Sequence, residues 1–463
     1  MKTIADGAAT ASAIAAGGLS AREAVDAAIA RIEAHDAGYN AFTLRTFERA
    51  RAEAAAVDKR RARGEALPPL AGVPYAVKNL FDIRGEVTVA GSKLLKSNPP
   101  AKEDAVLVQR MQAAGAVLLG ALNMDEFAYG FTTENSHVGP CHNPHDTTRI
   151  AGGSSGGSGA AVAGGLVPIA LGSDTNGSIR VPASLCGVWG LKPTFGRLSR
   201  RGSYPFVHNI DHLGPLADSV AMLAASYDAM QGPDPLDPGC HALAVQPVTP
   251  ELDKGTGKLR IGLLGGYFME HAGPAAQEAA RRVAKALDVV EIVEWPDAAL
   301  ARAAAFITTA AEGGALHLQH LRERAADMEP LSVDRFICGA LQPGAWLVNA
   351  RRFRRLYRDR VNELFQHWDL LIAPATPVPA PEIGTEWIEI QGQKHPCRPA
   401  MGLLTQPISY AGCPVVAAPL WPDAGQGLPV GVQLIAAPWR EDLALRAARV
   451  LESLHVAHPK AVA

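Results

Sequence analysis

Two glycine- and serine-rich stretches stand out in this sequence: Gly152-Gly-Ser154-Ser155-Gly-Gly157-Ser158-Gly159 and Gly172-Ser-Asp174-Thr-Asn-Gly177-Ser178-Ile-Arg180. Glycine lets neighbouring backbones approach closely, so such loops can turn several N–H groups toward one point and bind an anion. An isolated loop of this composition is usually a flexible linker. Here the flanking segments are strongly apolar, so we expect both loops inside a core, where their polar backbone needs partners or a ligand.

Two common motifs fit these loops less well. A phosphate-binding P-loop requires G-x-x-x-x-G-K-[ST], and neither loop contains a lysine. The segment 152–156 fits the G-x-S-x-G elbow of α/β-hydrolases, but residues 149–151 make a poor buried strand before it. No Asp and His stand out downstream as partners of that elbow. Both interpretations stay open at this point as weaker alternatives.

A lysine at the end of an apolar run offers a third interpretation. Lys78 ends the segment Gly72-Val-Pro-Tyr-Ala-Val-Lys78. On a surface it would extend its charge into solvent. At the edge of a buried sheet the ammonium form is disfavoured and the pKa falls, which makes a neutral lysine available as a base.

The order of the predicted elements favours an α/β fold. Ser20-Ala-Arg-Glu23 is a capping box that opens a helix, and a second helix is predicted over 42–63. Short apolar runs alternate with helical stretches over 70–216, which we take as the core. Residues 240–330 form a more variable segment, and apolar strands within 368–440 are expected to complete the same sheet.

Composition excludes several function classes. Lys and Arg number 44 against 46 Asp and Glu, so the net charge of −2 provides no field for nucleic acid or an anionic membrane. Six widely spaced cysteines form no C-x-x-C pair, which argues against a zinc site or disulfide framework. The N-terminus has no apolar targeting segment, and we expect a cytoplasmic protein.

Taken together, the motifs resemble the amidase signature family of Ser-cisSer-Lys amide hydrolases. Its pattern matches at Gly-Val-Pro-x-x-Val-Lys78, at Gly-Gly-Ser154-Ser-Gly-Gly-Ser and at Gly-Ser-Asp-Thr-x-Gly-Ser178-Ile-Arg. Further family-like pieces extend the resemblance over almost the whole chain. It implies a single domain over 1–463 with an α/β/α architecture, in which helices flank a central mixed β-sheet.

The resemblance also implies a catalytic mechanism. Ser178 would be the nucleophile that forms an acyl enzyme, Ser154 the bridging serine after a cis peptide bond, and Lys78 the base. The oxyanion would be held by backbone N–H groups of four residues, Thr175, Asn176, Gly177 and Ser178. No metal or organic cofactor is implied.

Other residues are expected to support this site. We expect Ser155 to hydrogen-bond within its loop, Asp174 and Arg180 to brace the oxyanion turn, and Asp125 to lie beneath the site. Each of these four is equally compatible with an ordinary polar role in a loop. An arginine-rich helical segment offers substrate-binding candidates, or else a solvated helix face: Arg351, Arg354 and Arg355.

Within the family, the sequence favours hydrolysis of a small, polar, anionic amide derived from urea. The alternative is the glutaminase component of a tRNA-dependent amidotransferase, which works beside a small helical partner, and other small amides also remain open. For either role we expect an oligomer with no direct contact to nucleic acid or membrane.

Overall fold

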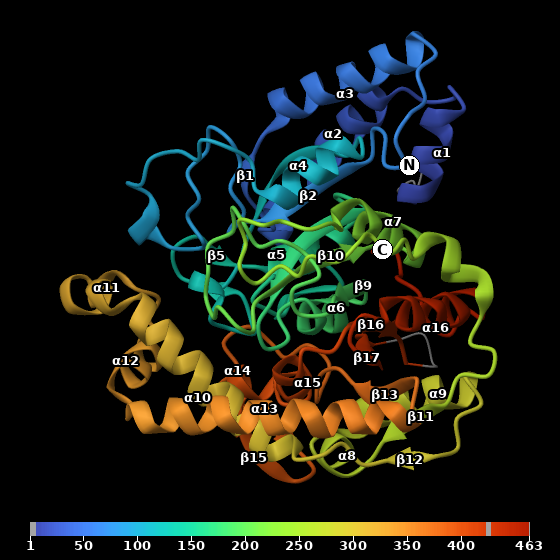
Figure 1. Cartoon of the computed structure of the whole chain (residues 1–463). Coiled ribbons are helices and arrows are strands. Elements are labelled where there is room, and N and C mark those ends of the chain that lie inside the picture. The colour runs from blue at the N-terminus through green and yellow to red at the C-terminus, as the bar shows by residue number, and fades with distance from the viewer. Residues whose placement is uncertain (1–5, 423–426, 463) are drawn as a thin grey trace.

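The computed structural model describes residues 6–422 and 427–462 of the 463-residue chain. Within these residues an 11-stranded mixed sheet forms the centre of the molecule (Figure 1). Its strands, in spatial order, are β1 (Phe42–Arg45), β3 (Val117–Leu122), β2 (Pro74–Lys78), β8 (Ile169–Asp174), β10 (His212–Ala217), β9 (Trp189–Lys192), β16 (Val415–Leu420), β17 (Val430–Ala436), β13 (Leu370–Pro374), β11 (Ile261–Leu264) and β12 (Ile292–Val293).

The pairing of β2 with β8 positions the site. The two strands are parallel, with Val77 opposite Leu171. Parallel strands carry their carboxyl ends to the same edge of a sheet. Lys78 at the end of β2 and Asp174 at the end of β8 are therefore brought to one edge.

The side chains of strand β2 alternate between two apolar cores. In β2, Tyr75 and Val77 belong to one core and Ala76 to the other, as the period of two in a strand requires. Helices α2 (Ala21–Tyr39), α3 (Phe47–Ala62), α5 (Gly156–Ala163) and α6 (Arg180–Cys186) contribute to the core that contains Ala76, and α4 (Val106–Ala113), α7 (Val220–Met230) and α16 (Glu441–Ser453) to the core that contains Tyr75. The three-layer α/β/α architecture with a mixed sheet is confirmed.

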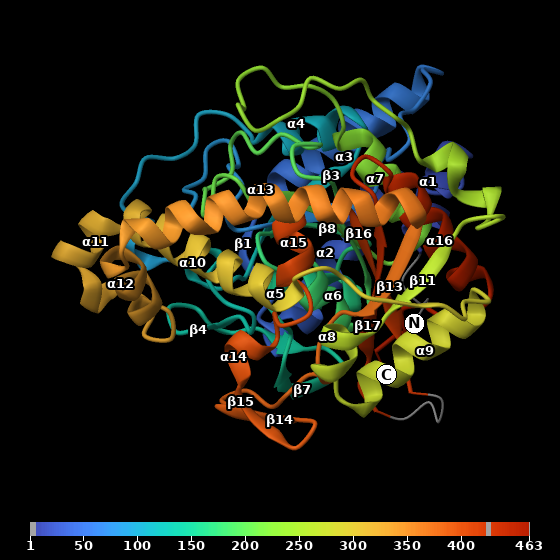
Figure 2. The same ribbon diagram turned by 60° about the horizontal axis from the view of Figure 1, so that its bottom comes forward.

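A group of helices extends to one side of the sheet. In Figure 2, α11 and α12 lie at the edge of the molecule and α13 crosses in front of the strands. Helix α10 contacts α12, α13 and α15, which connects this projection to the sheet. The remaining helices are α1 (Gly7–Ala15), α8 (Gly266–Glu270), α9 (Pro274–Ala286), α10 (Ala298–Leu316), α11 (Leu318–Glu323), α12 (Val333–Leu341), α13 (Gly344–His367), α14 (Cys397–Ala400) and α15 (Gln406–Ala411).

Three small hairpins lie outside the main sheet. They are β4 (Glu134–Asn135) with β5 (Gly139–Pro140), β6 (His142–Asn143) with β7 (Asp146–Ile150), and β14 (Trp387–Ile390) with β15 (Gln393–Pro396). Because β7 pairs only with β6 among the described strands, the segment before Gly152 is no buried sheet strand. This arrangement differs from the strand that leads into a hydrolase elbow.

Two helix predictions have different outcomes. The capping box forms, with Ser20 accepting from the N–H of Glu23 at the start of α2. The helix predicted over 42–63 is wrong at its start, because residues 42–45 form β1 and the helix begins at Phe47. Phe42 and Thr43 favour an extended strand at the sheet edge, and the Ala- and Arg-rich pattern becomes helical only after Thr46.

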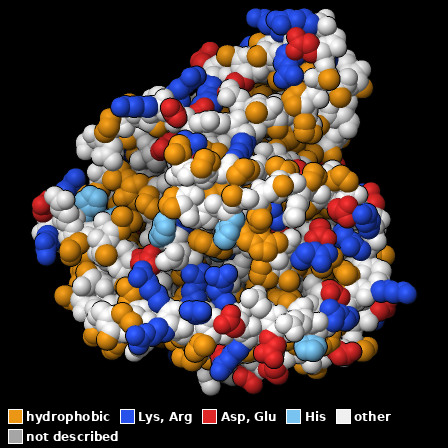
Figure 3. Space-filling view, viewed as in Figure 1, with side chains coloured by type: hydrophobic (Ala, Val, Ile, Leu, Met, Phe, Trp, Pro, Cys, Tyr) orange, Lys and Arg blue, Asp and Glu red, His pale blue; other side chains and the backbone are white. Residues whose placement is uncertain are grey.

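The surface carries mixed charge. Figure 3 shows basic, acidic and hydrophobic side chains interspersed over one face, with a group of Lys and Arg side chains near its centre. Among the described residues, no helix combines the length and the apolar character that crossing a membrane requires. The division of the chain into core and variable segments stays a prediction.

Candidate active site

Lys78 is fully buried at the end of β2, with a relative exposure of 0%. Its Nζ donates to Ser154 Oγ at 2.6 Å and to Ser173 Oγ at 2.8 Å. Burial lowers the pKa of Lys78 to about 7, and the more distant carboxylates of Asp125, Asp174 and Asp211 oppose this shift only in part. Near neutral pH, a substantial fraction of Lys78 is therefore an uncharged amine in contact with a serine hydroxyl.

The loop before α5 fixes the Ser154 hydroxyl. The peptide bond between Gly153 and Ser154 is cis, as the family resemblance implied. A Cβ atom at Gly153 would lie 2.2 Å from Asp125 Oδ2, so only glycine fits at this position. Asp125 also accepts from the Thr133 N–H at 3.1 Å. Asp125 thus lies against the loop that holds Ser154.

The second loop is braced by a buried ion pair. Arg180 donates to Asp174 from Nε at 2.9 Å and from Nη2 at 3.0 Å, and both side chains are fully buried. Burial would raise the pKa of Asp174, but the charge and hydrogen bonds of Arg180 hold it well below its usual value. Asp174 in turn accepts from the N–H groups of Gly177 at 2.7 Å and Ile179 at 3.2 Å. The carboxylate therefore sets the shape of the turn around Ser178.

The hydrogen bonds to Asp174 reduce the number of backbone N–H groups that remain for an oxyanion. Because the Gly177 N–H already donates to Asp174, three of the four expected donors are left for an oxyanion: Thr175, Asn176 and Ser178. Gly177 has a φ of 138°, and a Cβ there would lie 2.1 Å from Thr405 Oγ1. Glycine is thus required at this position, while the Thr175 hydroxyl is held by Asp211 at 2.7 Å.

Ser155 connects the two loops. Its hydroxyl donates to the Ser173 carbonyl at 3.1 Å and accepts from the Ser173 N–H at 3.2 Å. The Ser155 hydroxyl thus bonds across to the second loop, while the Ser155 carbonyl accepts from the Ser158 and Gly159 N–H groups within its own loop. The reason is that β8 passes directly beside the start of α5, where its backbone groups meet the Ser155 hydroxyl.

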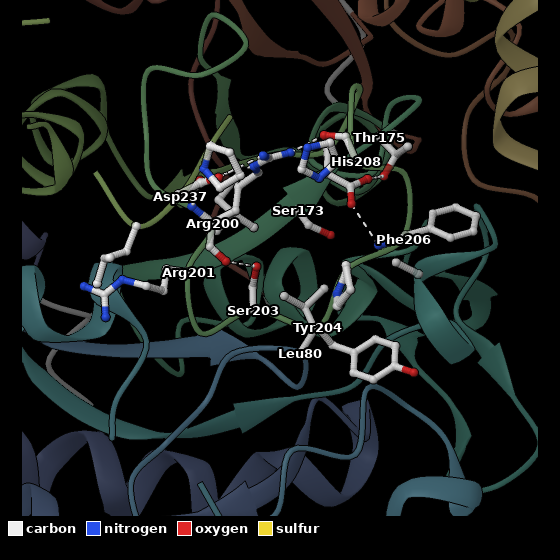
Figure 4. Close-up of a pocket in the computed structure, with 16 residues that line it drawn as sticks. Leu80, Ser173, Thr175, Arg200, Arg201, Ser203, Tyr204, Phe206, His208 and Asp237 are labelled. Carbon is white, nitrogen blue, oxygen red and sulfur yellow. Dashed lines mark hydrogen bonds and ion pairs between the residues drawn. The ribbon is translucent and has the colours of Figure 1, made fainter. Parts of the chain in front are cut away.

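Two cavities meet at the loop of residues 175–178, which we call the oxyanion loop after its expected role. One has a volume of about 20 Å³ and includes Ser178, Thr175 and Asn176 in its lining. The other has a volume of about 180 Å³ and includes Ser173, Thr175 and Arg200, as Figure 4 shows. The linings share Thr175, Ala128 and Phe206, so the space available near Ser178 suits a small substrate.

The structure does not bring the predicted arginines to Ser178. Arg351, Arg354 and Arg355 line a separate cavity of about 360 Å³ beside α13. Arg351 pairs with Glu312 at 2.9 Å, and Arg354 donates to the Tyr410 carbonyl at 2.9 Å.

A different arginine lines the Ser178 cavity. Arg335 of α12 is half-buried, and its guanidinium lies 4.2 Å from the centre of the Tyr129 ring. Burial lowers the pKa of Arg335, and the nearby Arg398 lowers it further. Arg398 lies 3.5 Å from Asp125, with Nε and Nη2 making no hydrogen bond among the described residues. Sequence analysis missed both arginines because each is isolated in the sequence and reaches the site only through tertiary packing.

Ser173 was missed as well, although it lies within the second quoted loop. Its position between Gly172 and Asp174, at the end of a buried run, is the signal that could have identified it. Within the described residues, no cluster of three or more His, Cys, Asp or Glu side chains is arranged to hold a metal ion.

A buried lysine in contact with a serine of a glycine-rich loop, at the edge of a mixed sheet, is the arrangement of a serine-dependent amide hydrolase. The chain belongs to the amidase family, whose model matches residues 23–445. It is an enzyme of that class, which hydrolyses amide C–N bonds. The resemblance inferred from the motifs is thereby confirmed.

Particular relatives are similar over nearly the whole chain. AtzE, a 1-carboxybiuret hydrolase subunit from Pseudomonas sp. (strain ADP), is 70% identical over 447 residues, which cover 96% of this chain and 98% of the relative. A Glutamyl-tRNA(Gln) amidotransferase subunit from Anaeromyxobacter sp. (strain K) is 38% identical, with 95% and 94% covered. One solved structure superposes on this chain with a TM-score of 0.97 at 69% sequence identity. The match covers 97% of this chain and 99% of the solved one, which is described as an unexpected vestigial protein complex that reveals the evolutionary origins of an s-triazine catabolic enzyme.

Proposed function

We propose that this chain hydrolyses a small, anionic amide derived from urea, with 1-carboxybiuret as its substrate and ammonia and a carboxylated urea as products. The observation that carries the chemistry is the contact of buried Lys78 with Ser154 at 2.6 Å. The substrate is supported by the small cavity at Ser178 with the adjoining cavity at Ser173 and by the 70% identity to a relative named as part of a 1-carboxybiuret hydrolase.

In the proposed first step, Ser178 Oγ attacks the amide carbonyl carbon. A serine hydroxyl is a weak nucleophile and needs a base. The proton of Ser178 passes to the Ser154 oxygen as the Ser154 proton passes to neutral Lys78. The oxyanion that forms is held by backbone N–H groups of the loop, each typically worth about 3 kcal/mol.

In the second step the amide C–N bond breaks. The leaving nitrogen takes the proton back from Lys78 through Ser154 and departs as ammonia. The acyl group remains on Ser178 as an ester. Water, activated by the same relay, then attacks the ester carbonyl, releases the acid and restores the Ser178 hydroxyl. The cycle needs no electron acceptor or other co-reactant.

Arg335 is the proposed partner for the substrate's carboxylate. It lines the cavity of Ser178 from α12. A guanidinium forms bidentate hydrogen bonds with a carboxylate, and partial burial strengthens them. Arg398 adds positive charge beside Asp125, and its Nε and Nη2 make no hydrogen bond among the described residues.

We also propose that the chain forms an oligomer, binds a small helical partner and is located in the cytoplasm. Several large hydrophobic side chains of α12 and α13 are exposed, including Leu341 at 78%, Trp346 at 54% and Leu356 at 60%. Such exposure is typical of a surface that another chain covers. The similar solved structure comes from a protein complex.

Ammonia release by the purified chain tests the function. We expect kcat/KM for 1-carboxybiuret to exceed that for biuret and for glutamine by at least about 100-fold, because only 1-carboxybiuret combines urea-type nitrogens with a carboxylate. The assay is run alone and with the products of neighbouring genes. The 38% identity to part of an amidotransferase makes glutamine the alternative. Glutamine turnover that rises only with tRNA and a partner would overturn the proposal.

A further inference from the structure

Among the residues that the structure describes, two side-chain carbonyl oxygens near Ser178 have no hydrogen-bond partner. Asn176 and Gln406 are buried, with relative exposures of 6% and 3%, and both line the cavity of Ser178. Within the described part of the chain, neither Asn176 Oδ1 nor Gln406 Oε1 is hydrogen-bonded. A buried acceptor without a donor is costly and rare in native proteins, so a pair of them in one cavity points to a ligand.

The Asn176 side-chain amide contacts α10. Its Nδ2 donates to Thr309 Oγ1 at 2.9 Å. With the nitrogen engaged there, the carbonyl oxygen is the end of the amide that remains for another partner. Thr309 lines the same cavity.

Gln406 is tied to the same wall. It is the first residue of α15, and the preceding Thr405 donates through its hydroxyl to the Asn176 carbonyl at 2.6 Å. The start of α15 and the oxyanion loop are therefore joined beside Ser178. The two unpaired acceptors belong to one surface of the cavity.

We propose that Asn176 and Gln406 select substrates of the urea type by accepting hydrogen bonds from their N–H groups. This inference rests on the proposed function and specifies how the nitrogens of its substrate are recognised. A urea-type carbonyl has nitrogen on both sides, and in a planar trans amide the N–H points away from the carbonyl oxygen. When that oxygen faces the backbone N–H groups of the loop, an N–H group beside the carbonyl is left to bond the side-chain acceptors of Asn176 and Gln406 on the same wall.

The site would discriminate against an analogue that leaves a side-chain acceptor without a hydrogen bond. A substrate with CH₂ in place of NH cannot satisfy one of the two acceptors. A site built to bond an N–H group rejects an analogue that lacks it, because the buried acceptor then stays without a donor. Arg335 would act on the charged end of the substrate, whereas these two amides act on its nitrogens.

Biuret and malonamide provide the test, because they differ only by NH against CH₂ at the central position. Each compound is titrated as a protectant of Ser178 against labelling by a fluorophosphonate, which reacts with the serine and needs no amide recognition. In the wild type we expect biuret to protect at a concentration at least about 10-fold lower than malonamide. In Gln406→Met or Thr309→Val, the ratio of the protecting concentration of malonamide to that of biuret should fall below about threefold. The protecting concentration of malonamide itself should stay unchanged.

Gln393→Met is the matched control, because Gln393 is exposed on β15, outside the Ser178 cavity, and the ratio should persist there. Labelling without a protectant shows that each variant retains an intact centre. A wild-type ratio below about twofold, or a ratio preserved in both cavity variants, would overturn the inference even if 1-carboxybiuret is hydrolysed. A failure of the proposed function would instead appear in the ammonia assay, which this binding measurement does not use.

Discussion

The Lys78 nitrogen donates to the Ser173 hydroxyl at 2.8 Å, in addition to its contact with Ser154. A hydroxyl that accepts from the ammonium form stabilises it more than the neutral amine. Ser173 therefore acts on the protonation state of Lys78 without lying in the proposed proton path. It is a positioning residue for the lysine.

Replacement of Ser173 should consequently shift the pH profile. In Ser173→Ala the ammonium form loses an acceptor, the pKa of Lys78 falls further, and the acidic limb of kcat/KM moves to lower pH. We expect kcat at the plateau to drop about 10-fold, because the amine loses one of its two orienting contacts. Ser173→Thr keeps the hydroxyl and should restore the wild-type midpoint. An unchanged midpoint in Ser173→Ala would contradict this role.

The two adjacent serines of the first loop should differ in their effects. Ser154 contacts Lys78, so Ser154→Ala interrupts the relay and should lower kcat by at least about 1,000-fold. Among the described residues, the Ser155 hydroxyl bonds to the Ser173 backbone and not to Lys78, so Ser155→Ala should cost mainly stability, about 1–3 kcal/mol in urea denaturation. Steady-state kinetics and denaturation of both variants measure the difference. If Ser155→Ala lowers kcat more than Ser154→Ala, the proposed proton relay through Ser154 is wrong.

The Asp174–Arg180 pair should dominate stability around the second loop. Arg180→Met leaves a fully buried carboxylate without its charged partner, and we expect a loss of about 3–5 kcal/mol in the free energy of unfolding. Asp174→Asn gives a complementary readout. The folded-state pKa of Asp174 is depressed, so its contribution is present above the unfolded value of 3.8 and is lost as the pH falls below it. As the pH falls through this acidic range, the free energy of unfolding of Asp174→Asn should decrease less than that of the wild type. The same pH dependence in both proteins would argue that the Asp174–Arg180 ion pair does not stabilise the fold.

Substrate binding by Arg335 can be separated from the arginines of α13. Arg335→Met should raise KM for 1-carboxybiuret at least about 10-fold while changing kcat/KM for neutral biuret by less than about threefold. Arg351→Ala is the control, because Arg351 is half exposed and pairs with Glu312 outside the Ser178 cavity. An equal loss for both substrates in Arg335→Met would indicate a structural role, and a larger KM effect in Arg351→Ala would restore the original expectation.

The sequence was sufficient for features that are local in the chain. The loops at Ser154 and Ser178 and the strand that ends in Lys78 each occupy a few consecutive residues, and their glycines specify close backbone approaches that the structure contains. The α/β architecture followed from the alternation of apolar runs and helical stretches. The early strand β1 was missed because an Ala-rich helical pattern continues directly from it.

Features that depend on distant segments could not be predicted in this way. Arg335 and Gln406 carry no distinctive local pattern, and they reach Ser178 because α12 and α15 pack against α10 and the oxyanion loop. Asn176 was selected for its backbone N–H alone, and the role now inferred for its side chain depends on Thr309 of α10. Burial and unpaired acceptors become visible only once the chain is folded.

The central claim is that neutral Lys78 activates Ser178 through Ser154, and the pH dependence of Ser178 labelling by a fluorophosphonate tests it most directly. The labelling rate should rise with pH around a midpoint near the lysine pKa of about 7, with the adduct located on Ser178 by peptide mass. In Lys78→Ala the rate should be low and without that midpoint. An adduct on Ser154 or Ser155, or the same midpoint in the absence of Lys78, would contradict the claim.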